Sequence, residues 1–171
     1  MYTLQEINKI SDASFIQLFG GVFEHSPWVA EKALMARPFS SFNHLYQTMV
    51  HIVKETTNQE KLALIKEHPN LGDRIKMSEN SVNEQKNAGL NQLTEKEYKQ
   101  FISMNQSYLD KFGFPFILAV RGKNKDEIYH SMVERIKNEK EEEFHQALTE
   151  IYQIALLRLE EIIIKDSITT N

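Results

Sequence analysis

The chain has 171 residues, a formal net charge of −4 and no cysteine, which excludes disulfides, thiolate metal sites and cysteine nucleophiles. Its hydrophobic fraction of 41% is enough for a sizeable core, and its length fits one domain. The overall charge does not suggest a nucleic-acid partner. No apolar run approaches the roughly 20 residues that cross a bilayer, and no secretion signal is visible, so we expect a cytoplasmic protein without a membrane partner.

Four helices are predicted in the first 67 residues. Each begins at a residue or pair that can cap or start a helix: Asp12, Ser26-Pro27, Ser41 and Thr57-Asn58. The first is expected over 13–24, although Gly20-Gly21 weakens it by about 1 kcal/mol per glycine. The second is expected to run to about Ala36. The fourth ends near Glu67, because Pro69 disfavours a helical conformation at His68.

Three more helices are predicted after residue 93, with one apolar segment between them. Their expected starts are a capping box of Thr94 and Glu97, a cap at Asp126, and the acidic run that begins at Glu139. Gly113 is expected to end the first of these helices in a left-handed conformation, and the last helix should reach about Ile164.

The apolar segment at 114–120 has no partner strand in the sequence, and Pro115 argues against a central strand. We interpret it as a buried extended segment, or as one that leads into a short helix. The predicted fold is therefore all-α, a single compact domain of about eight helices that is not a regular heptad bundle. The domain is expected over 1–164, with 165–171 as a frayed tail or the start of a linker.

Three side chains are candidates for chemistry, and each has a structural alternative. His68 can exchange a proton near neutral pH, but a histidine at a helix C-terminus is also favoured by the helix dipole. Glu84 can be a catalytic carboxylate or the fourth residue of a capping box that begins at Ser81. Arg158 lies among apolar residues, where its guanidinium either reaches water, pairs with a nearby residue such as Glu161, or faces a buried anion.

Metal and cofactor signals are weak. No phosphate-binding glycine loop, dinucleotide fingerprint, zinc helix or calcium loop is present. His44 and His51 are seven residues apart and could share a helix face, but two imidazoles without a third ligand are a poor metal site. We expect neither a metal nor a cofactor.

Five segments, taken in order, resemble the family of OHCU decarboxylases, which decarboxylate 2-oxo-4-hydroxy-4-carboxy-5-ureidoimidazoline (OHCU) in urate breakdown. The resemblance covers nearly the whole chain and rests on residues 23–28, 68–72, 81–85 with 88–90, 111–117, and 158–159. It implies an OHCU decarboxylase-like helical domain, a cofactor-free carboxy-lyase that yields (S)-allantoin and is usually a homodimer. It also implies covalent or functional association with urate oxidase, because family members can be fused to a urate oxidase domain.

The resemblance also assigns site residues. It makes His68 the catalytic histidine, and we expect Glu84 and Arg158 to act with it. The substrate contacts that it implies are Pro69, Ser81, Val82, Asn83, Glu84, Gln85, Ile117, Leu118, Ala119, Val120, Arg121 and Arg158. Acidic residues are common in relatives at the position of Asn70, so the charge beside His68 differs here.

The competing hypothesis is a non-catalytic helical module for dimerisation or scaffolding, partnered with a urate-oxidising enzyme. A further alternative is the same chemistry on another small acid that carries a ureido or imidazoline group.

Overall fold

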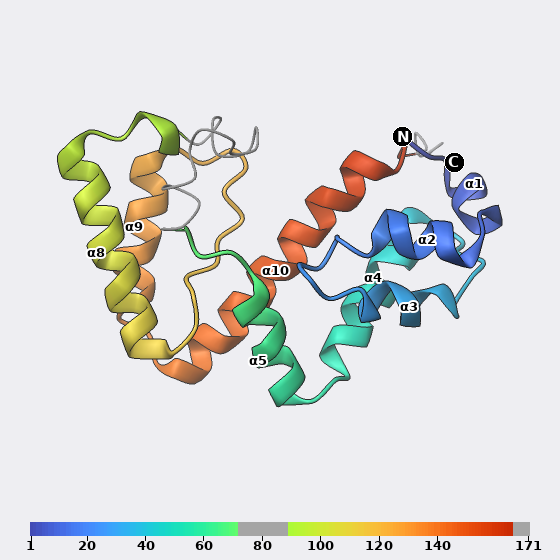
Figure 1. The fold of residues 1–171 in the computed structure, drawn as a ribbon, viewed down its shortest axis with the longest axis horizontal. Coiled ribbons are helices and arrows are strands. Elements are labelled where there is room, and N and C mark those ends of the chain that lie inside the picture. The colour runs from blue at the N-terminus through green and yellow to red at the C-terminus, as the bar shows by residue number, and fades with distance from the viewer. Residues whose placement is uncertain (72–88, 166–171) are drawn as a thin grey trace, which may run out of the picture. The chain divides into compact units, whose positions relative to one another are not determined.

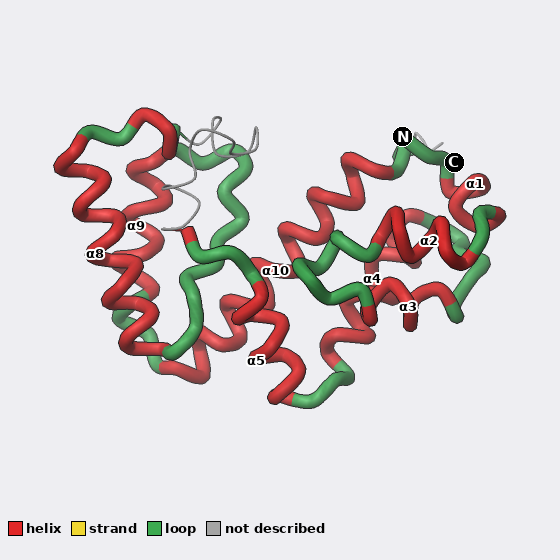
Figure 2. The backbone as a smooth tube through the Cα atoms, viewed as in Figure 1, coloured by secondary structure: helices red, strands yellow, loops and turns green. Residues whose placement is uncertain are grey.

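The computed structural model describes residues 1–71 and 89–165. Within them the chain forms eight α-helices and one short 3-10 helix, and its only β-type pairing is an isolated bridge between Tyr2 and Ile163 (Figures 1 and 2). The prediction of an all-α domain with about eight helices is confirmed. Two compact units are distinguished within it: Met1–Glu67 with the chain from Tyr152 onward, and His68–Ile151.

The first unit contains five short or medium helices and the end of the last one. Their bounds are α1 Leu4–Lys9, α2 Asp12–Phe19, α3 Trp28–Leu34, α4 Phe42–Lys54 and α5 Asn58–Glu67, followed by the C-terminal part of α10 Lys140–Ile162. The chain start is tied to the end of α10, since Tyr2 N–H donates to Ile162 O and Ile164 N–H donates to Tyr2 O, both at 2.9 Å. The N-terminus is thereby fixed on the unit that holds Arg158.

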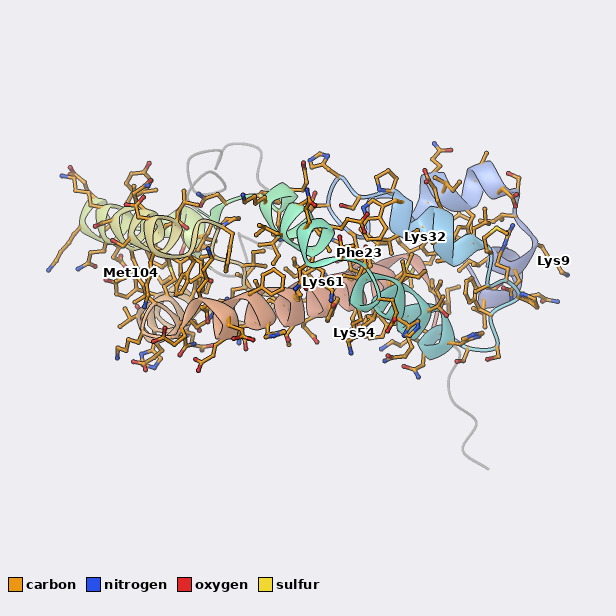
Figure 3. The ribbon with its side chains drawn as sticks, turned by 90° about the horizontal axis from the view of Figure 1, so that it is seen from below. Lys9, Phe23, Lys32, Lys54, Lys61 and Met104 are labelled. Atoms are coloured by element: carbon orange, nitrogen blue, oxygen red, sulfur yellow. The ribbon has the colours of Figure 1, made fainter. Side chains whose placement is uncertain are left out.

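Aromatic side chains fill the core of this unit. The rings of Phe15 and Phe19 lie 4.7 Å apart, and Phe39 stacks on Phe15 at 6.1 Å. Phe23 is 1% exposed and lies among the ribbons of the unit in Figure 3, whereas Lys9 extends away from them. The segment between α2 and α3 is therefore anchored in the core by Phe23 although it is not helical.

The second unit contains the 3-10 helix η1 Leu90–Gln92, α8 Glu95–Phe112, α9 Lys125–Arg135 and the N-terminal part of α10. The predicted capping box at Thr94 and Glu97 is confirmed, as is the left-handed cap at Gly113, whose φ is 75°. Residues 114–120 form no helix and run as a loop in Figure 2. They are buried, as interpreted, and no short helix follows them before α9, so of the two alternatives the lead into a short helix is wrong.

Several predicted helix ends are wrong by a few residues, for local reasons. Ser11, not Asp12, caps α2, which stops at Phe19 instead of reaching Glu24 because Gly20-Gly21 follows. Asn124, not Asp126, caps α9, and accepts from Glu127 N–H. The first helix, α1, was not predicted at all. Its signal is a capping box in which Thr3 and Glu6 bond each other's backbone amides.

A buried carboxylate joins the helices of the second unit. Glu143 is fully buried, and its Oε1 accepts from Tyr108 Oη at 2.6 Å and from Arg135 Nε at 2.8 Å. Its Oε2 accepts from Asn138 Nδ2 at 3.0 Å. A buried charge is tolerated when it is paired and hydrogen-bonded in this way. Burial raises the pKa of Tyr108 well above its ordinary value, and the hydrogen bond to Glu143 acts in the same direction, so the phenol stays a donor.

We predict that Tyr108→Phe destabilises the protein by about 1–3 kcal/mol, because it removes one of the donors to a buried carboxylate. For a chain of this length the melting temperature should fall by about 2–4 °C per kcal/mol. Thermal unfolding followed by circular dichroism measures the change.

Tyr129→Phe is the matched control, since the Tyr129 hydroxyl forms no hydrogen bond with any residue in 1–71 or 89–165 and its ring contacts Phe101. Equal melting temperatures for the two variants would contradict the importance of the Glu143 network.

Candidate functional site

His68 lies at the exit of α5, as predicted. The helix ends at Glu67, and Pro69 follows the histidine. The side chain is 5% exposed, so it is held in a mostly dry environment although it belongs to a loop. A buried imidazole at the end of a helix is suited to proton transfer with a small ligand that is shielded from water.

The segment after His68 is tied to α8. Asn105, which is 6% exposed, donates from its Nδ2 to Asn70 Oδ1. This contact connects the residues after His68 with α8, the helix whose C-terminal end begins the 111–117 segment. Sequence reasoning did not single out Asn105.

The predicted substrate contacts at Ser81, Val82, Asn83, Glu84 and Gln85 lie outside the described residues. Pro69 lies directly after His68, at intermediate exposure. The other predicted contacts in the second unit follow one another along the buried segment: Ile117, Leu118, Ala119 and Val120 are 1–8% exposed, and Arg121 is partly exposed at its end. A turn closes the segment there, in which Lys123 N–H donates to Val120 O at 3.0 Å and Gly122 has a φ of 80°.

Charged side chains from two helices hold the backbone of this segment. Arg135 of α9 donates from Nη1 to Ile117 O at 2.6 Å. Glu150 of α10 accepts from Ala119 N–H at 3.0 Å through Oε2, and Gln146 donates to the other carboxylate oxygen of Glu150 at 3.1 Å. Backbone groups that are buried outside helices and sheets need such partners, and here side chains supply them.

Arg135 also links the segment to the buried network of the second unit. Its guanidinium pairs with Glu143 and lies over the Phe116 ring, with Cζ 4.5 Å from the ring centroid. Sequence reasoning missed Arg135, Glu143 and Glu150. Glu143 was counted among the acids that favour the N-terminus of the last helix, yet it shares a four-residue spacing with Ala147 and Ile151, both buried, and that spacing is the signal for a core position.

Arg158 is positioned by Glu24 in the first unit. Its Nη2 lies 2.5 Å from Glu24 Oε1, and its Nη1 donates to Val22 O at 3.1 Å and to Gly21 O at 3.3 Å. Both charged side chains are about one-fifth exposed, so the pair is partly shielded from water. The suggested local partner, Glu161, is thus replaced by a residue 134 positions away in the chain.

The pairing leaves Arg158 with unused donors. A guanidinium has five N–H groups, and the three hydrogen bonds to residues 21–24 leave two of them without a partner in residues 1–71 and 89–165. The fork is held in place at one side and can donate at the other. It also joins two of the segments on which the resemblance rests, 23–28 and 158–159.

The described part of the chain contains neither a cluster of metal ligands nor a membrane-spanning helix. No three side chains of His, Asp or Glu in residues 1–71 and 89–165 gather to hold a metal ion. None of the helices in those residues combines the length and apolar character that a bilayer span requires.

The model of the OHCU decarboxylase family matches residues 8–160, which is most of the chain. The chain belongs to the OHCU decarboxylase family. The resemblance found in the sequence is thereby confirmed. A family member from Haloferax volcanii, named 2-oxo-4-hydroxy-4-carboxy-5-ureidoimidazoline decarboxylase, is 42% identical over 93% of this chain and 95% of its own length.

Longer relatives contain this family's domain as one part. A uric acid degradation bifunctional protein from Bacillus sp. (strain TB-90) is 52% identical over 95% of this chain, and the chain spans only 32% of it. Among solved structures, one described as (S)-allantoin synthase superposes with a TM-score of 0.80 at 30% identity, over 95% of this chain and 54% of that one. The chain therefore corresponds to a whole protein in some relatives and to about a third of others.

We predict that Glu24→Ala lowers the free energy of unfolding by about 1–3 kcal/mol, because it leaves the partly buried guanidinium of Arg158 without its carboxylate. Chemical denaturation measures the loss. Glu31→Ala is the control, since Glu31 is exposed on α3 and has no ion pair in the described residues. An equal stability of both variants would show that the Arg158–Glu24 pair does not support the fold.

Proposed function

We propose that this chain decarboxylates OHCU to (S)-allantoin without a cofactor, as a step in urate degradation. The observation that supports this proposal most strongly is the family match over residues 8–160, which includes the segment around His68. The name of the Haloferax volcanii relative supports the same reaction, because that protein aligns with this chain over nearly the full length of both.

The chemistry explains why no cofactor is needed. Loss of carbon dioxide breaks a C–C bond, and its electron pair forms a C=C bond to the carbon that carries the ureido group. The electron pair of the ring C=N moves onto the ring nitrogen, which takes up a proton. The hydroxyl on the reacting carbon then loses its proton to become a carbonyl, and the carbon that carries the ureido group gains a proton. The protein has only to position the substrate and move protons.

His68 is the residue that we propose moves these protons. A neutral imidazole can accept the hydroxyl proton and then deliver one to the ring carbon, acting as base and acid within one turnover. The low exposure of His68 supports this role, since bulk water would otherwise protonate the intermediate on either face. Delivery from one side explains a product of single handedness.

The other site residues are proposed to hold the substrate. The forked donors of Arg158 fit a carboxylate or carbonyl oxygen, and Glu84 fits the N–H groups of the ureido arm or ring. Pro69 and the segments 81–85 and 117–121 complete the proposed site. The buried, polar-anchored backbone of residues 117–120 supports a contact role for that part of the chain.

We also propose that the protein works together with a urate-oxidising activity, on the same chain or as a partner. The support is the bifunctional uric acid degradation proteins from Bacillus, of which this chain matches about a third. The homodimer and the cytoplasmic location that the sequence suggested stay predictions.

We predict that His68→Asn lowers the rate of stereospecific allantoin formation by roughly 100-fold or more, because asparagine cannot carry the proton. The assay generates OHCU from urate in situ and follows the optical activity of the allantoin formed. His130→Asn is the control, since His130 is exposed on α9. Near-normal turnover by a folded His68→Asn protein would refute the proposed role of His68.

A further inference from the structure

Leu118 is held through both of its peptide groups by oppositely charged side chains. The carbonyl of the preceding peptide group, Ile117 C=O, accepts from the Arg135 guanidinium at 2.6 Å. The N–H of the following peptide group, Ala119 N–H, donates to the Glu150 carboxylate at 3.0 Å. A cation and an anion thus hydrogen-bond the two peptide groups that flank Leu118.

The planar peptide bond determines where the remaining groups of Leu118 point. In a trans peptide the N–H and C=O of one unit point in opposite directions, and in the described residues the only cis peptide is Arg37-Pro38. Leu118 N–H therefore points away from Arg135, and Leu118 C=O points away from Glu150. The two charged side chains occupy one side of each peptide group and leave the other side for another partner.

The charges also change the strength of the groups on the open side. A cation on a carbonyl oxygen polarises the peptide so that its N–H becomes a stronger donor, and an anion on an N–H makes the linked carbonyl a stronger acceptor. Arg135 acts in this way on Leu118 N–H, and Glu150 acts in this way on Leu118 C=O. Leu118 then presents a strengthened donor and a strengthened acceptor.

These two groups have no hydrogen bond with any residue in 1–71 or 89–165, and Leu118 is only 8% exposed. Buried backbone groups without a partner cost about 1–3 kcal/mol each, so such a pair favours a ligand that satisfies both at once. A primary amide or a ureido group does so, because one N–H of its NH2 lies on the same side as its C=O.

We propose that Arg135 and Glu150 are positioning residues of the substrate site, which fix and polarise the backbone of Leu118 so that it binds an amide or ureido group of the substrate. This inference rests on the proposed function, since OHCU carries such groups. It adds an explanation of how the substrate is recognised. The backbone N–H and C=O of Leu118 make the hydrogen bonds to the substrate, and two charged side chains, one on α9 and one on α10, strengthen them.

The test is Glu150→Ala in steady-state assays with OHCU generated in situ. Glu150 is partly exposed, and its loss frees Ala119 N–H without removing core volume. A weakened contact to the substrate's unreacting arm affects the ground state and the transition state equally, so KM should rise about tenfold while kcat changes little. A purely structural defect would instead lower kcat through the fraction of folded protein and leave KM unchanged.

Two further variants complete the experiment. Glu150→Gln keeps an acceptor for Ala119 N–H but loses the charge, so its KM should lie between those of the wild type and Glu150→Ala. Glu142→Ala removes an exposed carboxylate of the same helix and should keep the wild-type KM. A wild-type KM in Glu150→Ala, a fall in kcat alone, or a Gln variant no better than the Ala variant would overturn the inference while the proposed function stands. A wild-type protein that does not accelerate OHCU decay would overturn both.

Discussion

The buried carboxylate of Glu143 is the constraint on which the second unit depends. It accepts from Tyr108 of α8, from Arg135 of α9 and from Asn138 in the connection to α10, so one side chain ties three successive elements together. A carboxylate that is removed from water needs these partners, because losing Arg135 would leave a buried charge without its counter-ion and losing Tyr108 or Asn138 would leave an oxygen without a hydrogen bond. The hydrogen bonds of Glu143 therefore restrict the arrangement of α8, α9 and α10 more than apolar contacts alone would.

The same constraint extends to the proposed site. Arg135, oriented by Glu143, bonds the carbonyl of Ile117 and lies over the ring of Phe116. The segment at 114–120 lies outside any sheet, so its backbone depends on side chains for hydrogen bonds. In the first unit Arg158 likewise donates hydrogen bonds to the carbonyls of Gly21 and Val22, and it forms an ion pair with Glu24. Charged residues thus hold irregular backbone in place in both units, and the part held by Arg135 and Glu150 is where the family resemblance expects substrate contacts.

Local signals made much of the fold predictable. The cap at Ser41, the capping box at Thr94 and the exit of α5 before His68 involve residues within four positions of one another, and all three predictions are confirmed. The caps predicted at Asp12 and Asp126 are wrong because another polar residue, one position earlier in the first case and two earlier in the second, has the backbone conformation of a cap. The site was harder to predict because its supporting contacts are distant in sequence. Glu24 and Arg158 are 134 residues apart, and no pattern in one sequence pairs them.

The most direct test of this account is to add the wild-type protein to OHCU that is generated in situ from urate and to follow the optical activity of the allantoin formed. The account predicts rapid appearance of one enantiomer, at a rate proportional to protein concentration, without any added metal or cofactor. Slow racemic product at the rate of the protein-free control would contradict it. The helical domain would then have to serve the alternative role of a non-catalytic module.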